Sequence, residues 1–168
     1  KYAVPEDLFS HRYEDLRSGA VFGVELDKDD VPIMFNRDSR DDAFERKAYR
    51  PSKGDPVAVA GQGFHWLIRD KILRGKLKTG TSLTFRLLIP GRFDYFSFRI
   101  RSAGERSGLV YLDVTLASLF LRMIANAEMR LVYDRNTGRL LEYRGPTAIK
   151  DERGRAIKAV RILYTYPD

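Results

Sequence analysis

The sequence predicts a mainly β protein: a curved, largely antiparallel sheet, open or closed to a half barrel, with one or two short helices packed on it. Two observations predict this fold class. From residue 81 onward, apolar residues often recur at every second position, which is the period of a β-strand. Near the C-terminus, the polar connections end in glycine, as short hairpins between antiparallel strands require.

Length and composition are those of a single globular domain, residues 1–168. A chain of this length buries roughly 70% of its unfolded surface on folding, so it needs no metal or disulfide to fold. The absence of cysteine excludes disulfides, thiol nucleophiles and thiolate metal sites. No apolar stretch is long enough to cross a bilayer.

Residues 1–58 predict an irregular N-terminal part with one short strand pair. Residues 21–26 have a strand pattern, and 33–36 can pair with them after the polar turn at 27–30. The stretch 37–56 is densely charged with both signs and contains two prolines and a glycine near its end. We therefore expect 37–56 to be mostly a surface loop.

A helix is predicted at about 63–74, near the start of the second part of the chain, 59–168. Its apolar stripe has the helical spacing i, i+3, i+4 and i+8 and consists of Phe64, Leu67, Ile68 and Ile72. Gly75 is a suitable C-terminal stop. The preceding Gly61-Gln62-Gly63 lacks the rest of a dinucleotide-binding fingerprint, so we interpret it as the helix entry.

The rest of the chain predicts strands. Three are expected in its middle, at 82–89, 93–102 and 108–116. Residues 117–124 match a helix template, and we prefer a short helix there, with a strand as the alternative. Three more strands, joined by connections ending in Gly138 and Gly154, predict an antiparallel meander within 129–133, 139–150 and 156–166.

The segment 81–101 has apolar residues on both faces of its strands. Phe96, Phe98 and Ile100 share one face, whereas Phe93 and Tyr95 lie on the other. A strand with one face in water does not have this pattern. Either protein covers both faces of the sheet, or one face lines a cavity for an apolar ligand.

Aromatic and basic residues alternate around this segment, and three interpretations stay open. Arginine stems can lie over aromatic rings beneath a covering helix, arginines can bind an anionic headgroup at the mouth of an apolar cavity, or the rings can stack bases. The second interpretation gives the candidate ligand-binding residues: Arg92, Phe93, Tyr95, Arg99, Arg101, Tyr111 and Tyr143.

Known catalytic and metal-binding motifs are absent from the sequence. The two histidines, His11 and His65, lie far apart, and no HExxH, GxSxG or Walker-type GK[ST] occurs. We therefore assign no catalytic residue, no metal ligand and no cofactor. Asp94 among aromatic residues, or His65, could act as acid or base in an alternative enzymatic reading, but an ion pair of Asp94 with Arg92 or Arg101 is favoured.

The positive charge is concentrated in one region. The net charge is +7, and residues 69–106 alone hold ten Lys/Arg against three Asp/Glu. A basic region can face phosphate, lipid headgroups or nucleic acid, and it can also simply keep a protein soluble.

Two groups of residues resemble a known family. The first runs from Gly63-Phe64 through Ile89-Pro90 to Phe98, and the second from Tyr133-Asp134 through Gly145-Pro146 to Ile162. Over roughly 60–168 the chain resembles an uncharacterised family of secreted or periplasmic bacterial proteins. The resemblance implies a bacterial envelope protein without an assigned activity, and more loosely the lipoprotein-carrier architecture, a curved sheet whose concave face is plugged by helices.

Together these observations predict a non-enzymatic bacterial envelope protein that binds a lipid-like or amphiphilic ligand on an apolar, concave sheet face. The alternatives are an enzyme with a carboxylate or histidine acid–base site, and a module that binds nucleic acid or an anionic surface. Peripheral membrane contact fits the first prediction, and nucleic acid is the less favoured partner. The chain opens at Lys1, so we expect an upstream segment, a secretory signal first of all, and a periplasmic or secreted location.

Overall fold

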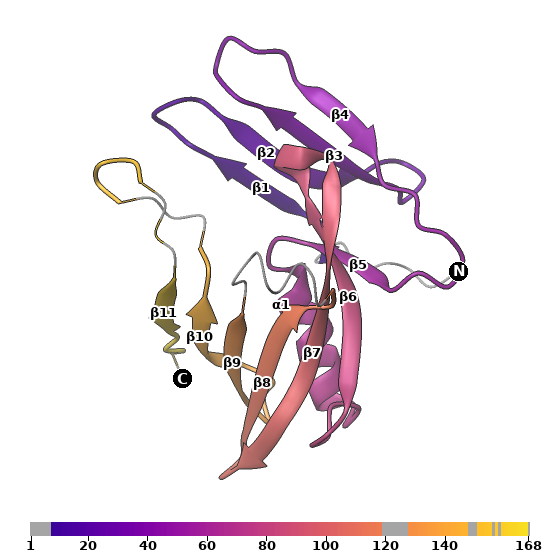
Figure 1. Ribbon diagram of the computed structural model, residues 1–168, viewed down its shortest axis with the longest axis vertical. Helices are drawn as coiled ribbons and strands as arrows, with labels where there is room; N and C mark the ends of the chain where they lie inside the picture. Colours follow the sequence, from indigo (N-terminus) through magenta and orange to yellow (C-terminus); the bar gives the residue numbers. More distant parts are fainter. Residues whose placement is uncertain (1–7, 119–127, 148–150, 156, 158, 168) are drawn as a thin grey trace. The chain divides into compact units, whose positions relative to one another are not determined.

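The computed structural model describes residues 8–118, 128–147, 151–155, 157 and 159–167. They form two sheets and one α-helix (Figure 1). The chain divides into two compact units. The first contains the described residues up to Leu67 together with Phe85–Ser97, and the second contains Ile68–Thr84 together with the described residues from Phe98 onward. The predicted fold class, mainly β with largely antiparallel, open sheets and a short helix, is confirmed.

A four-stranded antiparallel sheet belongs to the first unit. Its strands follow the chain order and are β1 (His11–Glu14), β2 (Val21–Leu26), β3 (Pro32–Arg37) and β4 (Glu45–Ala48). The predicted pair at 21–36 is thus the centre of a larger sheet. β4 lies inside the stretch expected to be a loop. Its four residues are all exposed, so the sequence has no apolar alternation there that would predict an edge strand.

The second sheet has seven strands in the order β11-β10-β9-β8-β7-β6-β5. Along the chain these are β5 (Val57–Ala60), β6 (Ser82–Ile89), β7 (Asp94–Arg106), β8 (Leu109–Leu116), β9 (Met129–Asp134), β10 (Leu140–Gly145) and β11 (Val160–Leu163). Neighbours from β7 to β11 are antiparallel, which confirms the predicted meander, whereas β5 and β6 are parallel. Of the predicted helix or strand at 117–124, residues 119–124 lie outside the described residues.

The helix α1 (Gly63–Leu73) connects the parallel strands β5 and β6, so the glycines before it stand at a strand–helix junction. That position is where phosphate-binding loops occur. Here, however, the space is filled by the chain itself. A Cβ on Gly61 would come within 2.3 Å of the His11 ring, and a Cβ on Gly63 would come within 2.1 Å of the Leu8 carbonyl oxygen. These glycines therefore allow close packing of the N-terminal segment.

Alternation along β8 shows how the second unit is packed. Val110, Leu112, Val114 and Leu116 are buried, and the residues between them face the other side of the sheet. Ile100 of β7 and Leu131 of β9 continue the buried face, and α1 lies against one face of the sheet (Figure 1). Protein thus covers the apolar face of β7, β8 and β9, which leaves an outer face with polar residues.

Candidate anion-binding face

A row of charged residues crosses the outer face of the seven-stranded sheet. Strand register places Arg101 of β7 opposite Asp113, Asp113 opposite Arg130, Arg130 opposite Arg144, and Arg144 opposite Arg161 of β11. We call these five residues the arginine row. Each lies at a position that alternation turns away from the core, so their side chains share one face.

Three of the row's four arginines, Arg130, Arg144 and Arg161, lie on the consecutive strands β9, β10 and β11, an arrangement that costs free energy. Like charges directly opposite one another on neighbouring strands repel. Two carboxylates offset part of this repulsion. Asp113 lies 3.6 Å from Arg130, and Glu142 pairs with both Arg161, at 2.9 Å, and Arg144. The hydrogen bond from Arg161, followed by that from Arg144, lowers the pKa of Glu142.

β7 carries three arginines on this face, two of them in addition to the row. Arg99 is opposite Thr115, Arg101 belongs to the row, and Arg106 is opposite Leu109. All three are exposed, and none has an ion pair within the described part of the chain. We call this surface the arginine face; it comprises Arg99, Arg101, Arg106, Arg130, Arg144 and Arg161.

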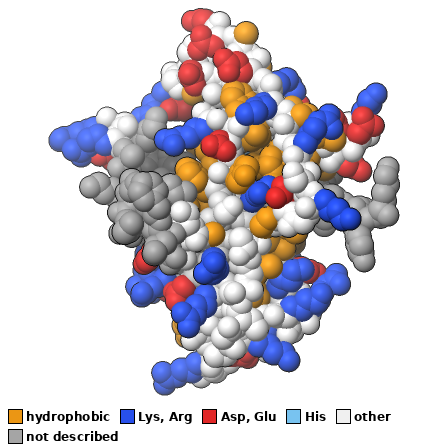
Figure 2. Space-filling model, turned by 45° about the vertical axis from the view of Figure 1, so that its right-hand side comes forward, with side chains coloured by type: hydrophobic (Ala, Val, Ile, Leu, Met, Phe, Trp, Pro, Cys, Tyr) orange, Lys and Arg blue, Asp and Glu red, His pale blue; other side chains and the backbone are white. Residues whose placement is uncertain are grey.

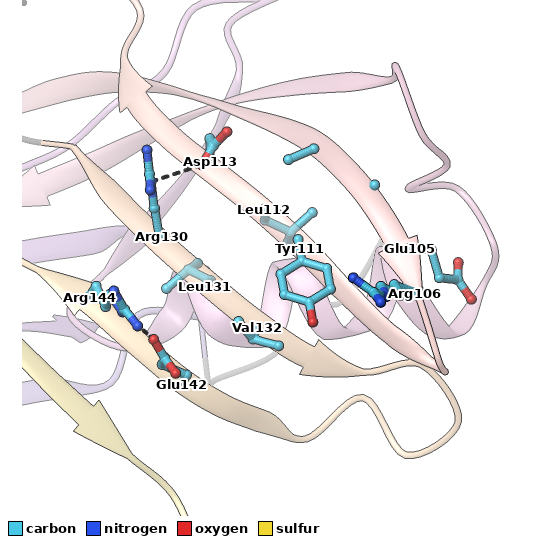
Figure 3. A pocket seen from close by; sticks show the side chains of 12 residues that line it. Glu105, Arg106, Tyr111, Leu112, Asp113, Arg130, Leu131, Val132, Glu142 and Arg144 are labelled. Carbon is cyan, nitrogen blue, oxygen red and sulfur yellow. Dashed lines mark hydrogen bonds and ion pairs between the residues drawn. The ribbon is translucent and has the colours of Figure 1, made fainter.

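A shallow groove of about 670 Å³ lies on this face. Figure 3 shows Tyr111 and Val132 between Arg106 on one side and Arg130 and Arg144 on the other. Strand register extends this less charged strip: Tyr111 is opposite Val132, Val132 opposite Glu142, and Glu142 opposite Leu163. The Tyr111 ring is 38% exposed and Leu163 is 62% exposed. A strip with one charged residue, Glu142, thus runs beside the arginine row.

Basic side chains are also common outside the arginine face, where the exposed residues include Arg12, Arg17, Arg46 and Arg74. Figure 2 shows Lys and Arg spread over the face that it presents, with acidic side chains among them. What distinguishes the arginine face is the alignment of three arginines on adjacent strands.

The seven predicted ligand-binding residues are divided between the two units. Arg99, Arg101 and Tyr111 share the outer face of the second unit. Tyr143 lies on the opposite face, because it pairs with the buried Leu131. Its hydroxyl donates a hydrogen bond to the Pro146 carbonyl, and burial raises its pKa to about 12.

The other three predicted residues belong to the first unit. Arg92 is exposed in the 3₁₀ turn Pro90–Arg92, and Phe93 has a left-handed φ of 50° and packs against that unit's core. The Tyr95 ring lies 4.3 Å from the Arg86 guanidinium and makes an edge contact with Tyr49. Tyr95 thus takes part in an internal packing cluster.

The structure also shows the surroundings of the alternative acid–base residues. Asp94 is exposed, its carboxylate accepts a hydrogen bond from the Tyr95 backbone N–H, and it has no ion pair within the described chain. The expected ion pair of Asp94 with Arg92 or Arg101 is therefore absent there. His65 lies beside Trp66. In the part of the chain that the structure describes, no three His, Asp or Glu side chains are grouped as a metal site requires.

Sequence reasoning missed the three arginines of β9, β10 and β11. Each stands next to residues of the covered face, as in Met129-Arg130-Leu131 and Val160-Arg161-Ile162. Strand alternation therefore predicts that each arginine side chain points outward. What the sequence could not supply is the register that aligns them. A shift of one residue in any pairing would turn one arginine to the other face.

Comparison with protein-family models, curated proteins and solved structures finds no match for this chain. Among the described residues, no helix is long and apolar enough to span a bilayer. The arrangement of the arginine face is therefore the basis for a functional assignment.

Proposed function

We propose that this protein is a non-enzymatic module that binds an anionic surface or polymer through the arginine face. The alignment of Arg130, Arg144 and Arg161 on adjacent strands is the observation behind the proposal. A fold that keeps like charges opposite one another loses stability. An anionic partner would relieve that repulsion, because charge-assisted hydrogen bonds to guanidinium groups are strong and often bidentate.

The extent of the row favours a partner with many anionic groups. From Arg101 to Arg161 it crosses four inter-strand spacings, which amounts to about 19 Å. A single phosphate or carboxylate can contact only two or three neighbouring guanidinium groups over such a distance. The whole row is therefore better matched by a multivalent anion.

The hypothesis of an enclosed lipid site receives less support from the geometry. Its apolar lining would have to come from the covered face of the sheet, where Ile100, Leu112 and Leu131 are at most 1% exposed. These side chains are in contact with protein rather than with an open cavity. The periplasmic or secreted location implied by the family resemblance remains part of the proposal, and it is compatible with anionic envelope components.

Salt dependence of binding tests the proposal. Fluorescence anisotropy with a labelled dextran sulfate should show affinity that falls steeply with added salt, because multiple ion contacts are screened. The Arg130→Gln/Arg144→Gln double variant should bind at least tenfold more weakly at low salt. The matched control is Arg12→Gln/Arg17→Gln, two similarly exposed arginines outside the arginine face. Equal loss in both double variants would contradict the proposal.

A further inference from the structure

We infer that the arginine face binds the headgroup layer of an anionic phospholipid membrane and that Tyr111 and Leu163 enter this layer. The inference rests on the proposed function and adds the class of partner. Three features of the face support it: its extent in two directions, its exposed apolar side chains, and the shortage of aromatic rings for base stacking in the arginine row and the strip beside it.

The arginines form an array rather than a line. Across the strands the row spans about 19 Å, and along β7 Arg99 and Arg106 are seven residues apart, which corresponds to about 23 Å for extended chain. A thread-like polyanion follows one line of contacts and would leave the arginines of the other direction unused. A layer of charged headgroups presents anions in two dimensions, so it can contact all six arginines.

The exposed apolar side chains lie within this cationic array. Tyr111 and Leu163 stand in the strip directly beside the arginine row, and Val132 and Glu142, whose carboxylate is paired with Arg144 and Arg161, lie between them. Exposure of such side chains to water is unfavourable. At a membrane interface a tyrosine ring and a leucine side chain can enter the boundary between headgroups and acyl chains, while arginines meet the phosphates.

A single-stranded nucleic acid fits this face less well. Proteins that bind single strands stack successive bases on several aromatic side chains. In the arginine row and the strip beside it, Tyr111 is the one exposed aromatic ring among the described residues. The carboxylate of Glu142, also in the strip, would stand where a base has to lie.

Vesicle co-sedimentation provides the test. The protein should bind vesicles of phosphatidylcholine mixed with phosphatidylglycerol and should not bind phosphatidylcholine alone. Each of Arg130→Gln and Arg144→Gln should weaken binding about five-fold, the effect expected for one arginine at an anionic surface. Leu163→Glu should also weaken binding to the mixed vesicles. Its effect relative to the wild type should be larger at raised salt, where the apolar contribution dominates. Leu16→Glu is the matched control, since Leu16 is exposed at 77% in the turn after β1.

The outcomes separate this inference from the proposed function. If the protein binds a single-stranded oligonucleotide or dextran sulfate through the same arginines but not the mixed vesicles, the inference is overturned and the proposed function stands. If no polyanion or vesicle binds, both fail. If Leu163→Glu behaves like Leu16→Glu on the mixed vesicles, apolar entry is overturned. Circular dichroism of each variant shows that a loss of binding is not a loss of fold.

Discussion

At the scale of single residues, Glu142 is the acidic partner of two arginines of the arginine face. Its carboxylate pairs with Arg144 and Arg161, and these hydrogen bonds lower its pKa. While it is ionised, it competes with any external anion for both guanidinium groups. Glu142 therefore stabilises the folded sheet and, under the proposed function, would limit anion binding at the same time.

Replacement of Glu142 should separate these two effects. We expect Glu142→Gln to bind dextran sulfate or anionic vesicles several-fold more tightly than the wild type, because two arginines lose an internal partner. Anisotropy or co-sedimentation at fixed salt measures the change. Glu152→Gln, an exposed carboxylate outside the face, is the control. Unchanged affinity in Glu142→Gln would mean that Arg144 and Arg161 do not contact the anion.

The same group predicts a pH dependence. Because the folded-state pKa of Glu142 is lowered, its stabilising effect is present above the ordinary glutamate pKa and is lost as pH falls through the lowered value. The stability difference between wild type and Glu142→Gln should therefore shrink in that acidic range. Thermal unfolding at a series of pH values measures it, and a difference that grows toward acid would contradict the assignment.

Tyr95 provides a residue-scale test of the first unit. The ring contacts Arg86 and Tyr49, and Arg86 in turn donates hydrogen bonds to the Tyr49 hydroxyl and to Asp55. We expect Tyr95→Ala to lower the free energy of unfolding by about 1–2 kcal/mol through loss of the cation–π and edge contacts. Tyr95→Phe should be nearly neutral. Chemical denaturation measures both, and anion binding should change in neither.

At the scale of elements, the junction between β5 and α1 shows how a short motif can be misread. Its two glycines suggest a ligand loop, but the His11 ring and the Leu8 carbonyl lie directly against them. The requirement for glycine is therefore steric and conformational. Gly61 has a φ of +48°, a left-handed conformation that other residues adopt at a cost.

Gly61→Ala should destabilise the protein by about 2–4 kcal/mol, since a left-handed alanine and a clash with the His11 ring both contribute. Gly54→Ala is a matched control for the conformational part alone. Gly54 also has a positive φ, and a Cβ there would meet nothing within 4 Å. Thermal denaturation of both variants measures the difference. Adding His11→Ala to Gly61→Ala should recover part of the loss, and no recovery would exclude the clash.

Element by element, the sequence predicted α1, β6 and β8 within about one residue, because each has a continuous apolar period. β7 begins one residue later and ends four residues further on than expected. Its register shifts between Ser102 and Gly104, and such an irregularity has no clear sequence period. β4 was missed because all its residues are exposed. Local patterns thus predicted the longer strands with one buried face. They missed the four-residue strands β1, β4 and β5, and β5 was missed although three of its four residues are buried, because so short a run has no clear period.

At the scale of the whole molecule, the candidate site depends on long-range pairing. Arg101 and Arg161 are sixty positions apart in the sequence, and four strand registers align them in one row. The predicted Arg99, Arg101 and Tyr111 were found to share a face, because they belong to two adjacent strands of predictable alternation. The sequence could not predict that the other four candidate residues lie away from this face. Their positions follow from the left-handed turn at Phe93 and from the pairing of Tyr143 with Leu131.

The most direct test of the central claim is a map of the residues that an anion perturbs. Backbone amide resonances of ¹⁵N-labelled protein should be recorded while a short, unlabelled dextran sulfate is added at low salt. We predict that the largest shifts occur along β7 to β11, around Arg101, Arg130, Arg144 and Arg161, and that salt reverses them. Shifts concentrated in the four-stranded sheet β1–β4, with the seven-stranded sheet unchanged, would contradict the account.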